Sequence, residues 1–94
     1  MDAKKLEISI MDIWKDVFGN SNIGVKDNFF LIGGDSLKAI KIIRLMQKEK
    51  LIAEDVSMSI IYSAPTIEIM VKKILSEHNS STKSSQNKFE EGVL

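Results

Sequence analysis

The sequence predicts an all-α fold, a small bundle of three main helices and one short helix, with a long structured loop between the first two. Three observations support it. Apolar residues recur at helical spacing in three segments. No segment alternates apolar and polar residues as a half-buried strand does. The 94 residues, 44% of them hydrophobic, are enough for one core but too few for two.

The first helix is predicted over residues 4–18, and Gly19-Asn20 is expected to end it. Its inward stripe has spacings of three and four and consists of Leu6, Ile10, Ile13, Trp14, Val17 and Phe18. Residues 19–35 then combine four glycines with several large apolar side chains. A loop of this length and composition is expected to fold back onto the core, with Phe29 and Phe30 holding the Gly33-Gly34 turn in place.

The second helix is predicted from Ser36 to about Lys50. Its inward residues are expected to be Ala39, Ile42, Ile43 and Met46, and an outer stripe carries Lys38, Lys41, Arg44 and Lys48. Residues 36–50 hold five basic side chains and one acidic, a local charge of +4 in a chain whose thirteen basic and thirteen acidic residues cancel. Leu37 and Ile40 lie on the first turn, where we expect partial exposure.

Residues 51–64 lack a clean period, and we expect an irregular link with one short helical turn near residues 59–62. Pro65 precedes the last helix, which Ser63 or Thr66 is expected to cap. After His78 the sequence is almost entirely polar until Phe89. Such a segment buries too little apolar surface to offset its ordering entropy. We therefore expect a folded domain over residues 1–78 and a flexible tail or linker over residues 79–94.

Several function classes are disfavoured by composition. The neutral total charge argues against binding to nucleic acid or a membrane surface, and there is no run of apolar residues long enough for a signal or a membrane span. Without cysteine, and with His78 as the single histidine, neither disulfides nor a metal site are expected. A cytoplasmic, monomeric protein fits these observations.

Gly34-Asp35-Ser36-Leu37 also matches a short signature of serine esterases. Those enzymes need a catalytic histidine and a much longer α/β chain, so no catalytic residue is assigned. What the motif does predict is a serine hydroxyl at the start of a helix, where Asp35 or Ser36 is the cap. Backbone N–H groups and the positive end of the helix dipole favour an anion at that place, above all a phosphate. Ser36 is the candidate site.

The stretch Asp27-Asn28-Phe29-Phe30-Leu31-Ile32-Gly33-Gly34-Asp35-Ser36-Leu37 resembles the signature of the peptidyl carrier (thiolation) domains of nonribosomal peptide synthetases. Further matches are Ile13-Trp14 through Phe18-Gly19, Ile23-Gly24 and Ala64-Pro65-Thr66-Ile67. Together they span residues 6–75 in the order and spacing of the family. Residues 51–62 match the family only loosely, which leaves the length of the third helix open.

The resemblance implies a four-helix carrier fold that catalyses nothing itself. It implies that a phosphopantetheinyl transferase, using coenzyme A and magnesium, attaches 4′-phosphopantetheine to Ser36, and that Gly33, Gly34, Asp35 and Leu37 form the supporting motif. The thiol of the arm would carry an aminoacyl or peptidyl thioester. Docking of partners is expected at Leu37, Ile40, Lys41 and Arg44.

The implied partners are the transferase, an adenylation domain, a condensation or epimerisation domain, and a thioesterase. Carriers that serve ordinary condensation often have histidine at the position of Asp35. An aspartate at this position resembles the carriers placed before epimerisation domains. The alternatives are an acyl carrier protein of fatty-acid or polyketide synthesis, which usually has an acidic second helix, and a helical interaction module with Ser36 unmodified. A free-standing carrier and a domain of a larger synthetase are both compatible with the sequence.

Overall fold

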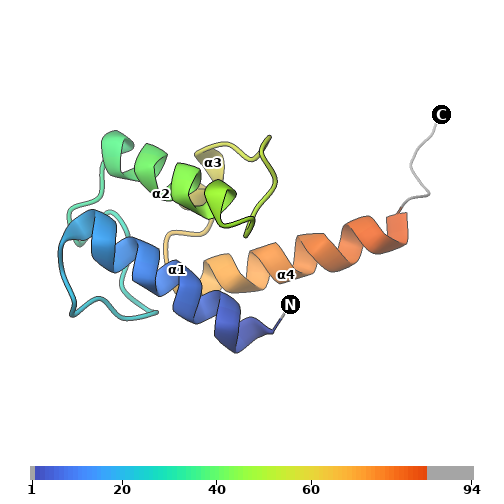
Figure 1. Cartoon of the computed structure of the whole chain (residues 1–94), viewed down its shortest axis with the longest axis horizontal. Helices are drawn as coiled ribbons and strands as arrows, with labels where there is room; N and C mark the ends of the chain where they lie inside the picture. The colour runs from blue at the N-terminus through green and yellow to red at the C-terminus, as the bar shows by residue number, and fades with distance from the viewer. Residues whose placement is uncertain (1, 85–94) are drawn as a thin grey trace.

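The computed structural model describes residues 2–84, with side chains up to residue 77. Within this range there are four helices and no strand: α1 (Ala3–Phe18), α2 (Ser36–Lys48), α3 (Ser59–Ser63) and α4 (Ile67–Ser84). α1 packs against both α2 and α4, and the loop between α1 and α2 closes one end of the bundle (Figure 1). The predicted all-α bundle of three main helices and one short helix is confirmed. No helix of the described range is long and apolar enough to cross a membrane.

Side-chain caps set the starts of the three main helices. Asp2 and Asp35 accept hydrogen bonds from backbone N–H groups in the first turns of α1 and α2. The Thr66 hydroxyl accepts one from the Ile69 N–H at 3.1 Å, so Thr66 rather than Ser63 caps α4. α1 ends at Gly19, whose φ of 63° is the left-handed conformation that glycine adopts without strain.

Two helix boundaries differ from the expected ones. α2 ends at Lys48 instead of Lys50, because Lys50 adopts a left-handed φ of 62° that turns the chain out of the helix. α4 continues to Ser84, so residues 79–84, which were expected to belong to the flexible tail, are helical. Residues 79–84 contain neither glycine nor proline. Once a helix is established, each of these residues adds only a small unfavourable free energy of helix propensity, so the helix extends through them. The rest of the predicted tail, residues 85–94, lies outside the described residues.

The core is built from all four helices and from the loop between α1 and α2. Phe29 of that loop is fully buried and meets the rings of Trp14 and Phe18 edge-on, at centroid distances of 5.6 and 5.5 Å. The buried apolar residues are Leu6, Ile10, Ile13, Trp14, Ile23, Phe29, Ala39, Ile42, Ile43, Met46, Ile60, Ile61, Ala64, Ile67, Met70 and Val71. The four inward residues predicted for the second helix are all among them.

The loop of residues 19–35 is bound to the start of α4 by two backbone hydrogen bonds. The Phe29 N–H donates to the Pro65 carbonyl at 2.7 Å, and the Glu68 N–H donates to the Val25 carbonyl at 3.0 Å. Ile23 and Phe29 of the same loop are buried. These two side chains and the two backbone bonds together hold the loop against the bundle. The prediction that this segment folds back on the core is confirmed for Phe29.

Candidate functional site

The turn before α2 consists of Gly33 and Gly34, and a side chain at either position would be strained or would clash. Gly33 has a φ of 101°, which L side chains rarely adopt. The Gly34 N–H donates to the Phe29 carbonyl at 2.8 Å. A Cβ on Gly34 would lie 2.5 Å from that carbonyl oxygen and would overlap the Phe29 ring. The turn is therefore fixed to a fully buried side chain, and so is the position at which α2 begins.

Ser36 is the first residue of α2 and is exposed. Asp35 provides the cap, because its carboxylate accepts the Lys38 N–H at 2.9 Å. The Ser36 hydroxyl is therefore not needed for capping. It lies where the first backbone N–H groups of the helix and the positive end of the macrodipole face solvent. A negative group attached to this oxygen would be stabilised there by about 0.3 to 1 kcal/mol.

The charge next to this hydroxyl is a carboxylate. The hydrogen bond from the Lys38 backbone N–H is the largest influence on Asp35, and it lowers the pKa of that carboxyl below its ordinary value. The Lys38 ammonium lies 3.8 Å from the second carboxylate oxygen of Asp35 and 5.8 Å from the centre of the Phe18 ring. Lys38 thus places a cation beside Asp35, which reduces the repulsion that Asp35 would exert on an anion at Ser36.

Exposed apolar side chains lie on the first turn of α2, on the loop before it and on α3. Leu37 is 61% exposed, as predicted, and Ile40 is partly buried. Phe30 and Leu31 of the preceding loop are also exposed, and the Phe30 ring stacks on Tyr62 of α3 at 5.2 Å. We call Phe30, Leu31, Leu37 and Tyr62 the apolar face.

Sequence reasoning did not assign Phe30, Leu31 or Tyr62 to a surface. The sequence did contain one signal for Phe30, namely its position directly after Phe29. Two adjacent residues of a tight turn rarely both point into the core, and here Phe29 is the buried one. Tyr62 directly follows two isoleucines that are both buried, Ile60 and Ile61. A helix of five residues is too short for its period to reveal the outward position.

Lys41 and Arg44, the two charged docking candidates, lie on the exposed side of α2. They line a hollow between α1 and α2. The structure therefore places the predicted residues on two surfaces of α2: Ser36 and Leu37 at its N-terminus, and Lys41 and Arg44 along its side.

This geometry suits the covalent attachment of an acidic phosphate group to Ser36. The oxygen is accessible, the helix terminus is favourable for an anion, and the glycine turn leaves the approach free of side chains at residues 33 and 34. Residues 9–74 match the family described as "Phosphopantetheine attachment site". The chain belongs to this family.

Known proteins similar to this carrier domain include peptide synthases and carrier structures. The chain is 45% identical to Gramicidin S synthase 2 of Brevibacillus brevis over 66 residues, which are 70% of the chain and 1% of that synthase. BlmI, a type-II acyl-carrier-protein of Streptomyces verticillus involved in bleomycin biosynthesis, superposes with a TM-score of 0.70 at 25% identity, covering 81% of this chain and 89% of BlmI.

A second solved structure contains the phosphopantetheine transferase Sfp in complex with coenzyme A and a peptidyl carrier protein. It matches with a TM-score of 0.67 at 31% identity, covering 76% of this chain and 90% of the matched one. The prediction of a carrier (thiolation) domain whose cofactor is 4′-phosphopantetheine is confirmed. The domain spans only 1% to 7% of the length of synthases such as Gramicidin S synthase 2 and Gramicidin S synthase 1.

Proposed function

We propose that Ser36 is the attachment site of 4′-phosphopantetheine and that the domain carries aminoacyl or peptidyl groups as thioesters during nonribosomal peptide synthesis. The observation that carries this proposal is the exposed Ser36 hydroxyl at the N-terminus of α2, held by a glycine turn that is pinned to Phe29. The protein is then a substrate of its partner enzymes and not itself a catalyst. It works in the cytoplasm as a monomer.

Each group at the site has a physical task in this function. On the transferase, the Ser36 oxygen would form a bond to the phosphorus that carries the pantetheine of coenzyme A, while the pyrophosphate bond breaks. Adenosine 3′,5′-bisphosphate would leave, the transferase would take the hydroxyl proton, and a negatively charged phosphodiester would remain at the helix terminus. The backbone N–H groups of the first turn stabilise that charge. Asp35 holds the first turn through its cap and Lys38 offsets the carboxylate charge. The bound arm supplies the thiol that forms the thioester.

The partners follow from this role. The phosphopantetheinyl transferase loads the arm, an adenylation domain supplies the aminoacyl group, and a condensation, epimerisation or thioesterase domain consumes the thioester. We propose that Leu37 and Ile40 make the apolar contacts with these partners, because a few side chains that become fully desolvated in a partner's pocket supply most of the affinity of an interface. Lys41 and Arg44 mainly set orientation and encounter rate, which salt screens.

An acyl carrier protein of fatty-acid or polyketide synthesis is the second candidate, and the likeness to BlmI favours it. The charge of +4 over residues 36–50 favours the peptidyl carrier, because acyl carriers usually present an acidic second helix to basic partners. Both candidates use Ser36 and differ in the group that the thiol carries. Loading the arm with aminoacyl and with fatty acyl groups, and measuring transfer of each, separates them.

The test of the attachment site is intact-mass measurement after incubation with coenzyme A and a transferase of broad specificity. We expect the wild-type chain to gain one phosphopantetheine group and Ser36→Ala to gain none. Because Asp35 and not Ser36 caps α2, the substitution should leave the thermal midpoint nearly unchanged. A Ser36→Ala protein that still gains the arm would show that the site is elsewhere, and a wild-type chain that never gains it would leave Ser36 as part of an unmodified module.

Docking is tested by the initial rate of loading in Ile40→Ala, with circular dichroism melts measured alongside. We expect slower loading without unfolding, and a smaller effect of Lys41→Glu that fades at high salt. An Ile40→Ala protein that loads normally but melts at a much lower temperature would show that Ile40 stabilises the core and does not dock partners.

A further inference from the structure

The side of α2 and the last turn of α1 enclose a hollow of about 360 Å³. It is lined by Asp16 and Val17 from α1 and by Lys41, Arg44 and Leu45 from α2. Val17 and Leu45 are partly buried against the core, whereas the three charged residues are exposed. The hollow therefore has an apolar base and a charged rim, and we call these five residues the cationic groove.

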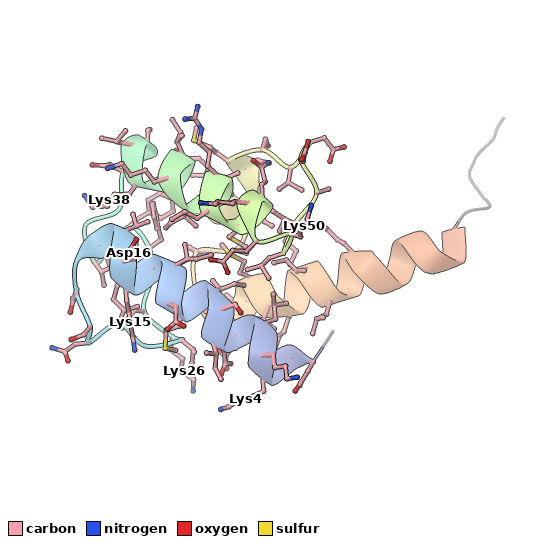
Figure 2. The ribbon with its side chains drawn as sticks, viewed as in Figure 1. Lys4, Lys15, Asp16, Lys26, Lys38 and Lys50 are labelled. Carbon is pink, nitrogen blue, oxygen red and sulfur yellow. The ribbon has the colours of Figure 1, made fainter. Side chains whose placement is uncertain are left out.

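The charged rim is available to a partner. The ion pairs of the described residues join Lys4 to Glu7, Lys38 to Asp35 and Lys73 to Glu77, and none of them involves the rim of the groove. Figure 2 shows Asp16 on the edge of α1 that faces α2, while Lys15 projects from the opposite edge. Two cations from α2 thus face one carboxylate from α1, which leaves a net positive rim.

The size and chemistry of the groove restrict what it can bind. Small-molecule sites usually have about 300 to 1,000 Å³ and are deeply enclosed. This hollow lies near the lower end of that range, but it is open along the helix pair. It has room for one or two apolar side chains. A nucleic acid is disfavoured, because its phosphate backbone would meet the Asp16 carboxylate and the basic surface is narrow. An acidic peptide segment fits, since its carboxylates can reach Lys41 and Arg44 while an apolar side chain covers Val17 and Leu45.

We propose that the cationic groove is a docking site for an acidic, amphipathic segment of a partner protein. The segment would place carboxylates on Lys41 and Arg44 and an apolar side chain on Val17 and Leu45. This inference rests on the proposed function, in which partner proteins dock on the carrier, and it adds a second contact surface to the apolar face near Ser36. A partner could then hold the domain by the side of α2 while Ser36 and the arm stay accessible.

The probe for this site is a synthetic acidic peptide, acetyl-EELLEEL-amide, added to the isotope-labelled 94-residue chain. We expect amide chemical shifts to move most at Val17, Leu45 and their neighbours. Lys41→Glu combined with Arg44→Glu should weaken binding about tenfold or more, as the loss of two exposed charge contacts predicts. Lys48→Glu is the matched control, because it reverses the same charge on the same helix outside the groove and should have a much smaller effect.

The outcomes are distinct. Equal loss of binding in Lys48→Glu, equal binding of the basic peptide acetyl-KKLLKKL-amide, or shifts centred on Leu37 and Tyr62 would each overturn the groove assignment. Ser36→Ala should bind the acidic peptide as the wild type does. A carrier whose Ser36 is loaded but whose groove does not bind the peptide refutes only this inference, whereas a chain that binds the peptide but is never loaded refutes only the proposed function.

Discussion

The two long connecting segments of the molecule are held in different ways. Residues 19–35 lead into the functional site and are anchored through the core, by buried Ile23 and Phe29 and by backbone hydrogen bonds to Pro65 and Glu68. Residues 49–58 have no fully buried side chain: Leu51, Ile52, Val56 and Met58 are only partly buried against the core, and the Gln47 side chain adds polar contacts. The Gln47 amide donates to the carbonyls of Ala53, Glu54 and Val56 at 3.1 to 3.4 Å.

This difference matches the tasks of the two segments. The first must fix the position of Ser36 to within a bond length, because a partner enzyme has to reach one oxygen, and a packed core resists small displacements. The second only returns the chain from α2 to α3. A segment held by partly buried side chains and by one amide should open locally at a lower free energy than a segment held by a fully buried ring. We therefore expect the two segments to respond differently to substitutions.

The largest expected effect is that of Phe29→Ala. Removing a fully buried ring that packs against Trp14 and Phe18 should cost about 3 to 5 kcal/mol of unfolding free energy. Chemical denaturation followed by circular dichroism measures it. Phe30→Ala is the matched control, since the neighbouring ring is exposed on the surface and should cost far less. Equal costs for the two substitutions would show that the first segment is not anchored through Phe29.

Gly34→Ala should have the next largest effect. The added Cβ would overlap the Phe29 ring and carbonyl, and overpacking of this kind costs about 1 to 3 kcal/mol. Because the turn sets where α2 begins, we also expect slower loading of Ser36. In the control Gly24→Ala, the added Cβ would meet its nearest neighbour, the Asp27 carboxylate, at 3.9 Å, an ordinary contact. If both variants melt and load alike, the Gly34 turn does not position the site.

Gln47→Ala tests the second segment. Its amide bonds to three exposed or part-buried carbonyls that water can reach, so we expect a loss of only about 0.5 to 1.5 kcal/mol. Amide hydrogen exchange should accelerate over residues 53–56 while residues 29–34 keep their protection. Gln47→Glu, which has a similar shape but turns a carboxylate toward the same three carbonyl oxygens, should cost at least as much as Gln47→Ala. Faster exchange in residues 29–34 as well would mean that the two segments open together.

The contrast also explains which parts of the structure could be predicted from sequence. Helical periodicity located the three main helices and the inward side of α2, and the glycine pair located Ser36, because both signals are local. The end of α4 was missed, since polar residues without glycine or proline permit a helix that composition alone does not demand. The cationic groove was not predictable either, because it depends on how closely α1 approaches α2.

The smallest expected effect concerns the electrostatics of Asp35, at the end of the first segment. The folded state lowers the pKa of this carboxyl, chiefly through the Lys38 backbone N–H, relative to an ordinary value of 3.8. The unfolded chain therefore binds the proton more tightly. The contribution of Asp35 to stability is fully present above the unfolded pKa and is lost as the pH falls below 3.8 through the folded pKa.

Side-chain carboxyl titration by NMR should give Asp35 a pKa below 3.8. In Lys38→Ala the backbone donor remains, so the pKa should rise only slightly and stay below the ordinary value. Asp35→Asn keeps a capping oxygen but has no charge to titrate, and its thermal midpoint should fall less steeply than that of the wild type below pH 4. An Asp35 pKa that returns fully to 3.8 in Lys38→Ala would show that the ammonium, and not the backbone of the first turn, controls the charge next to Ser36.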